Sequence, residues 1–154
     1  MTMIRTLMAL FLVPVMLVGD INSAHAELPD GGIGEIKTLD AGTFVIRGDA
    51  RESAALGGIV FQGDEFETDS QGAVGITFID GSTLSLGSDS YMEIDAFIFV
   101  PQDEKLGFAV HFLKGTAMYL SGRIAKLSPE DVKISTPLAT IGIRGTRLLI
   151  QVAE

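Results

Sequence analysis

The chain has no cysteine and no tryptophan, and its 11 basic residues face 20 acidic ones, which gives a net charge of −9 at pH 7. The absence of cysteine excludes a disulfide scaffold, thiol catalysis and cysteine-ligated zinc or iron–sulfur sites. The shortage of lysine and arginine argues against a nucleic-acid partner, because phosphate binding depends on clustered cations. The composition is 47% hydrophobic and 20% charged, which is too apolar for a disordered chain. Eighteen glycines predict many turns.

Long hydrophobic runs are also missing, except near the N-terminus. An uncharged and mostly apolar run follows Arg5 over residues 6–18, and it falls short of the roughly 20 residues that cross a bilayer. Ala24-His25-Ala26 then gives the small-x-small pattern of a signal peptidase site. We therefore expect a signal peptide over residues 1–26, cleaved after Ala26; an uncleaved anchor or a buried helix is the alternative.

The signal peptide sets the expected domain organisation. We expect a flexible leader over residues 27–35 and one domain over residues 36–154, with no membrane span in the mature chain. The mature protein is then periplasmic or secreted.

The pattern after the leader predicts strands. Val74, Ile76 and Phe78 alternate with other residues, and Asp80-Gly81 follows as a hairpin-type turn. No stretch keeps the apolar spacing of an amphipathic helix. Further segments of this kind cover residues 44–47, 59–61, 83–86, 92–100, 108–113, 117–120, 132–135 and 148–152. We expect an all-β single domain of about ten short strands, as an irregular sandwich or a solenoid-like fold, with one helical turn starting at Ser128.

Few residues offer catalytic chemistry. His111 is the one histidine of the mature chain, and its place in a strand pattern favours a histidine on a polar face over a catalytic base. One imidazole also excludes a histidine-rich metal site. Five acids gather at Asp64, Glu65, Glu67, Asp69 and Asp80. They are compatible with a glycan hydrolase or a calcium site, but an acidic, solvated surface is the simpler interpretation. We expect no enzyme, no cofactor and no metal.

The densest set of conformational constraints lies at residues 136–146. Pro137 favours an extended Thr136, and Gly142 and Gly145 permit a positive φ or a close backbone approach on either side of Arg144. The Arg144 guanidinium then has two interpretations. It either pairs with an internal acid such as Asp80 or Asp95, or it captures an anionic ligand.

These residues resemble a known family. Residues 136–146 read T-P-L-A-T-I-G-I-R-G-T and resemble the closing signature of FecR-type domains, while G-D-E-F-E-T at 63–68 and F-I-D-G-S-T-L at 78–84 resemble earlier segments of the family, in order. The resemblance covers about residues 36–152. It implies an all-β extracytoplasmic domain in which the motif residues are mainly structural. These motif residues are Asp80, Gly81, Thr136, Pro137, Gly142, Arg144, Gly145 and Thr146.

The family's namesake regulates ferric citrate uptake and passes a signal from a loaded outer-membrane transporter to a sigma factor. This sequence resembles only the sensor-side domain, because no cytoplasmic segment precedes its apolar run and no signalling domain follows. We therefore expect an exported binding or signalling-accessory module with an envelope protein or glycan as its partner. The alternative is a structural or adhesion module of an envelope or surface assembly.

Overall fold

A computed structural model describes residues 28–143 and 147–153, and its chain is almost entirely β-structure. The predicted signal peptide lies outside the described residues. The strands, in chain order, are β1 (Gly32–Leu39), β2 (Thr43–Arg47), β3 (Ala50–Ser53), β4 (Ile59–Phe61), β5 (Glu65–Thr68), β6 (Val74–Phe78), β7 (Thr83–Leu86), β8 (Tyr91–Val100), β9 (Lys105–Leu120), β10 (Val132–Ser135), β11 (Thr140–Gly142) and β12 (Arg147–Val152). The helical segments are η1 (Pro101–Asp103), α1 (Arg123–Leu127) and η2 (Pro129–Asp131).

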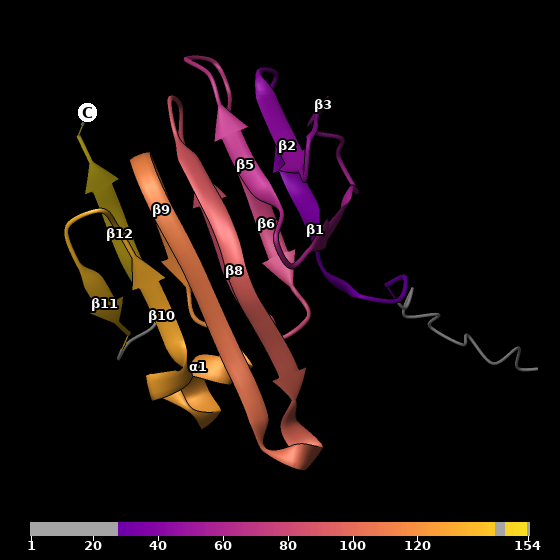
Figure 1. The fold of residues 1–154 in the computed structure, drawn as a ribbon, viewed down its shortest axis with the longest axis vertical. Helices are drawn as coiled ribbons and strands as arrows, with labels where there is room; N and C mark the ends of the chain where they lie inside the picture. Colours follow the sequence, from indigo (N-terminus) through magenta and orange to yellow (C-terminus); the bar gives the residue numbers. More distant parts are fainter. Residues whose placement is uncertain (1–27, 144–146, 154) are drawn as a thin grey trace, which may run out of the picture.

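The strands form two sheets that share the long strand β9. The first sheet has the order β3-β2-β5-β8-β9-β10-β11, and the second has the order β4-β1-β6-β7-β9-β12. The first part of β9 pairs with β8 and β10, whereas its last six residues, from Gly115 on, pair with β7 or β12. Gly115 has a φ of +91° at this change of partners. Figure 1 shows β10, β11 and β12 on one side of the molecule and β1, β2 and β3 on the other.

The core lies between the sheets and is rich in aromatic rings. Phe97 and Phe108 come from the first sheet, and Phe78 and Tyr119 come from the second. The ring of Phe108 lies 5.0 Å from that of Phe78, edge to face, and 5.4 Å from that of Tyr119. The alternation that predicted β6 places Val74, Ile76 and Phe78 in this core, because side chains two apart share one face of a strand. The predicted all-β fold class is therefore confirmed.

The N-terminal leader is the main correction. The prediction of a flexible segment over residues 27–35 is wrong for residues 32–35, which belong to β1 and pair with β4 and β6. The glycines there let strands approach rather than flex, since a Cβ on Gly34 would lie 2.8 Å from the carbonyl oxygen of Thr77. Ile33 is buried as well.

Other differences concern the number and length of the strands. The segments expected at 108–113 and 117–120 are one strand, β9. The short strands β3, β5 and β11 were not expected as strands, and neither was helix α1. The helical turn after Ser128 is confirmed as η2, although the Ser128 side chain does not cap it.

Candidate functional site

The C-terminal motif begins with a tight turn that joins β10 to β11. The Thr136 backbone N–H donates to the carbonyl of Ala139 at 2.7 Å, and the Thr136 Oγ1 accepts a hydrogen bond from the Ala139 N–H at 3.1 Å. The turn leaves Leu138 94% exposed at its tip. Thr136 and Pro137 therefore shape a hairpin that presents an apolar side chain to solvent.

The rest of the motif divides into described and undescribed residues. Gly142 ends β11 in extended backbone opposite Lys133, and a Cβ added there would meet no described residue within 4 Å. The expected positive φ or close approach at Gly142 is therefore wrong. Arg144, Gly145 and Thr146 lie outside the described residues, so the partner of Arg144 stays a prediction.

Asp80 is buried in the turn between β6 and β7. Its Oδ1 accepts hydrogen bonds from the Ser82 N–H at 2.9 Å and from the Ser82 hydroxyl at 2.6 Å, and its Oδ2 accepts one from the Ile124 N–H at 3.2 Å. Gly81 supplies the positive φ, +81°, that the turn requires. Gly122 packs directly against this turn, because a Cβ there would lie 2.6 Å from Asp80 Oδ2. Asp80 thus fastens helix α1 to the β6–β7 turn.

Tyr119 lies beside this carboxylate. Burial, and then the negative charge of Asp80, raise the pKa of Tyr119 to about 12, against smaller opposing effects of the Ser82 side chain and the Gly122 backbone. No group in the described part of the chain makes a well-formed hydrogen bond with the Tyr119 hydroxyl. A buried hydroxyl of this kind is destabilising rather than functional by default.

Asp64 is the second buried carboxylate, and it has a cationic partner. Arg47 of β2 donates to it twice, from Nε at 2.6 Å and from a terminal nitrogen at 2.7 Å, and the Phe61 N–H donates to Asp64 Oδ2 at 2.9 Å. The hydrogen bond with Asp64 raises the pKa of Arg47. The Arg47 guanidinium also donates to the Ile59 carbonyl and lies 4.7 Å from the centre of the Phe61 ring. Arg47 was not predicted as a site residue. The one pointer to it in the sequence is Asp64, an acid in the Gly63-Asp64 turn that has no basic residue near it along the chain.

The structure gives the predicted acids separate structural tasks. Glu67 pairs with Arg51 at 2.9 Å, and Asp69 Oδ1 accepts a hydrogen bond from the Gln71 N–H. Over residues 28–143 and 147–153, no three histidine, aspartate or glutamate side chains lie close enough together to hold a metal ion. His111 lies on β9 opposite Glu93 of β8 and Ser135 of β10. Four of the five acids that suggested a hydrolase therefore act in turns and ion pairs, and the fifth, Glu65, is a half-buried residue of β5.

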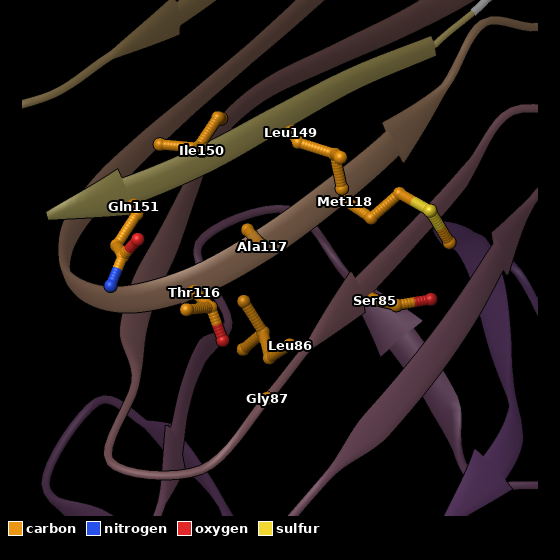
Figure 2. Close-up of a pocket in the computed structure, with 9 residues that line it drawn as sticks. All are labelled: Ser85, Leu86, Gly87, Thr116, Ala117, Met118, Leu149, Ile150 and Gln151. Carbon is orange, nitrogen blue, oxygen red and sulfur yellow. The ribbon is translucent and has the colours of Figure 1, made fainter.

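Two apolar grooves lie beside β12. One has a volume of about 620 Å³ and extends over β7, β9 and β12. In Figure 2, Leu149 and Met118 point to the same side of neighbouring strands, and Ser85 continues the row on β7. The other groove, of about 360 Å³, lies between β11 and β12 and includes Leu138 and Ile141. Neither groove could be predicted from the sequence, because both depend on which strands lie at the edges of the sheets.

No helix in the described part of the chain is both long enough and apolar enough to cross a membrane.

Comparisons with known proteins agree with the motifs. A family model described as FecR protein matches residues 64–154, from the Asp64 turn through the Asp80 turn to the C-terminal hairpin. Comparisons with curated proteins and with solved structures found no match. Because the matched segment covers more than half of the sequence, the chain belongs to the FecR family.

Proposed function

We propose that this protein is an exported, non-catalytic module that binds a protein partner and acts on the sensor side of envelope signalling. The observation that carries the proposal is the FecR match over residues 64–154, since that family is regulatory and works through protein interactions. The FecR-like motifs support it in a second way. Asp64 and Asp80 are both buried and bound by neighbouring groups, so neither is offered to a substrate.

Export is the part of the proposal that rests on sequence. The apolar run at residues 6–18 and the Ala24-His25-Ala26 site support secretion through a cleaved signal peptide. The test is the intact mass of the protein recovered from cells that produce it. A mature chain beginning at Glu27 in the envelope or the medium is expected, and a full-length chain in the cytoplasm would contradict export.

The binding role is tested by cross-linking in producing cells. The full chain carries a C-terminal tag, and an unrelated exported protein with the same tag is the control. We expect one envelope protein to be enriched on the FecR-family chain over the control. No enriched protein under any growth condition that yields soluble, folded protein would contradict a partner-binding role.

A structural module of an envelope assembly is the second candidate, and the exposed strand β12 favours it, because edge strands support assembly. The same experiment separates the two. A signalling partner changes in amount with growth conditions, whereas an assembly component stays in constant ratio.

A further inference from the structure

The edge strands on the two sides of the sandwich differ, and only the β3/β4 side is protected against the addition of another strand. On the β3/β4 side, Arg47 donates to the carbonyl of Ile59 and the Asp64 carboxylate accepts from the N–H of Phe61, so side chains occupy backbone groups at both ends of β4. Strand β3 is four residues long and fully exposed, and its Arg51 and Glu52 are charged. Short, charged edges of this type resist the addition of another strand.

The β11/β12 side has none of these protections among the described residues. Among residues 28–143 and 147–153, strand β12 pairs only with β9, so the backbone groups on its other side have no strand partner there. Its six residues contain one charge, on Arg147. Leu149 is 72% exposed and Leu138, on the neighbouring hairpin, is 94% exposed. This side combines an available strand edge with exposed apolar side chains, which is the arrangement used in strand addition.

The grooves give an added strand places for its side chains. The groove of about 360 Å³ lies between β11 and β12, and it shares Leu149, Ile150 and Gln151 with the larger groove over β7, β9 and β12. Side chains of an extended segment alternate between two sides. One set of alternate side chains would therefore enter an apolar groove while the other set faces solvent.

The charge distribution indicates the chemistry of the segment. Residues 28–104 contain fifteen acidic and three basic residues, whereas residues 105–153 contain two acidic and seven basic ones. The exposed Lys133 of β10 and Arg147 of β12 flank the open edge, and neither forms an ion pair with another described residue. A protein of net charge −9 thus has two exposed cations, Lys133 and Arg147, beside this edge.

We propose that the β11/β12 edge binds an extended, acidic segment of a partner protein, which adds to β12 as an antiparallel or parallel strand and places apolar side chains in the adjoining grooves. The proposal rests on the proposed partner-binding function and assigns its surface. Lys133 and Arg147 select the acidic segment, because charges at an interface rim favour partners of opposite sign and repel those of like sign. A second copy of the chain fits less well, because it brings the same cations to the same edge.

The test uses two eight-residue peptides that alternate valine with a charged residue and carry one terminal tryptophan. The charged residue is glutamate in the first peptide and lysine in the second. Because the chain has no tryptophan, the fluorescence reports the peptide alone. We expect the full-length protein to bind the glutamate peptide about tenfold more tightly than the lysine peptide at low salt. Hydrogen exchange should slow at the backbone of β12 on binding and stay unchanged at β3.

Matched variants locate the site. Arg147→Glu should remove the preference for the glutamate peptide, whereas Lys105→Glu, the same change at the exposed start of β9, should keep it. Leu149→Asp should weaken binding about tenfold, and Leu56→Asp, at a side chain 67% exposed outside the edge, should not. Equal affinity for the two peptides, no binding of either, or no effect of Leu149→Asp would overturn the proposal.

Two further outcomes separate this proposal from its alternatives. A dimer in sedimentation that Leu149→Asp dissociates would give the edge to a second copy and would overturn the assignment to a partner segment. If the cross-linked envelope protein is recovered equally well with Arg147→Glu and Leu149→Asp, the partner-binding function stands and the β11/β12 assignment fails. If no protein is cross-linked at all, the function itself fails.

Discussion

The fold buries two aspartates, and different kinds of group bind their carboxylates. Asp64, near the β3/β4 side, holds a bidentate ion pair with Arg47. Asp80 is bound by the Ser82 side chain and by backbone N–H groups, and among the described residues it has no cationic partner. The Asp64 carboxylate pairs with the Arg47 cation, and this ion pair helps to close the β3/β4 edge. The Asp80 carboxylate fastens helix α1 to the β6–β7 turn without a cation, and the cations Lys133 and Arg147 are exposed on β10 and β12, whose places Figure 1 shows. One fold thus uses an ion pair to close the sheet edge on one side and leaves cations exposed beside the edge on the other side.

The largest expected effect is the loss of the closing ion pair. Asp64→Ala should lower the free energy of unfolding by about 3 kcal/mol, because it leaves the Arg47 guanidinium and the Phe61 N–H without their acceptor. Arg47 is half exposed, which keeps the loss at the lower end for broken buried pairs. Urea denaturation of the full chain measures it. Asp49→Ala, at an exposed carboxylate in the β2–β3 turn, is the control and should change the value by less than about 0.5 kcal/mol. Equal losses would show that Asp64 does not close the edge.

Tyr119, which lies beside Asp80, makes the free energy of unfolding depend on pH in the alkaline range. The pKa of Tyr119 is about 12 in the folded protein, above the roughly 10 of an unfolded tyrosine, so the folded state keeps a proton that the unfolded chain releases. The free energy of unfolding is therefore unaffected below pH 10, falls as the pH rises from about 10 to 12, and levels off above that, with a total loss of about 2–3 kcal/mol.

Tyr119→Phe isolates this effect. The variant should lose the alkaline slope in denaturation curves collected from pH 8 to pH 12, whereas Tyr91→Phe, at a half-buried position of β8, should keep it. Near pH 7 the Tyr119→Phe protein should be about as stable as the original, because the buried hydroxyl makes no well-formed hydrogen bond with a described group. An unchanged slope would mean that Tyr119 titrates as an ordinary tyrosine.

Two glycines compare the packing at the Asp80 turn with that of the open hairpin. Gly122→Ala should cost about 1–3 kcal/mol, because its Cβ would press on Asp80 Oδ2 and on the Ser82 backbone nitrogen. Gly142→Ala should be neutral or slightly stabilising, since β11 is extended there and space is open. Thermal melts of the two variants test the pair. The reverse order would mean that Gly142, and not Gly122, has the constrained backbone.

The glycines also show which features of the structure could be predicted from the sequence and which could not. Alternating apolar residues predicted β6, β7 and most of β8 and β9, because the period of two is written in one segment. The close approaches of Gly34 and Gly122 depend on residues far away in the chain, Thr77 and Asp80, and no local pattern records them. The FecR-like phrases contained both buried aspartates, and Asp80 was named as a motif residue, but Arg47, the partner of Asp64, lies in a strand before the matched segment. The open edge could not be predicted, because it depends on the order of strands in the sheets.

The smallest expected effect on stability is that of Leu149→Ala at the open edge. The same change at its neighbour Ile150 should have a much larger effect. Leu149→Ala should change the free energy of unfolding by less than about 0.5 kcal/mol because the side chain is 72% exposed. Ile150→Ala should cost about 2–3 kcal/mol because Ile150 faces the core and is 8% exposed. A slip of one residue in the pairing of β12 with β9 would turn every side chain of β12 to the other face. The order of the two losses in urea denaturation therefore tests the register, and a larger loss for Leu149→Ala would turn Leu149 into the core and remove the apolar side chain on which the open edge depends.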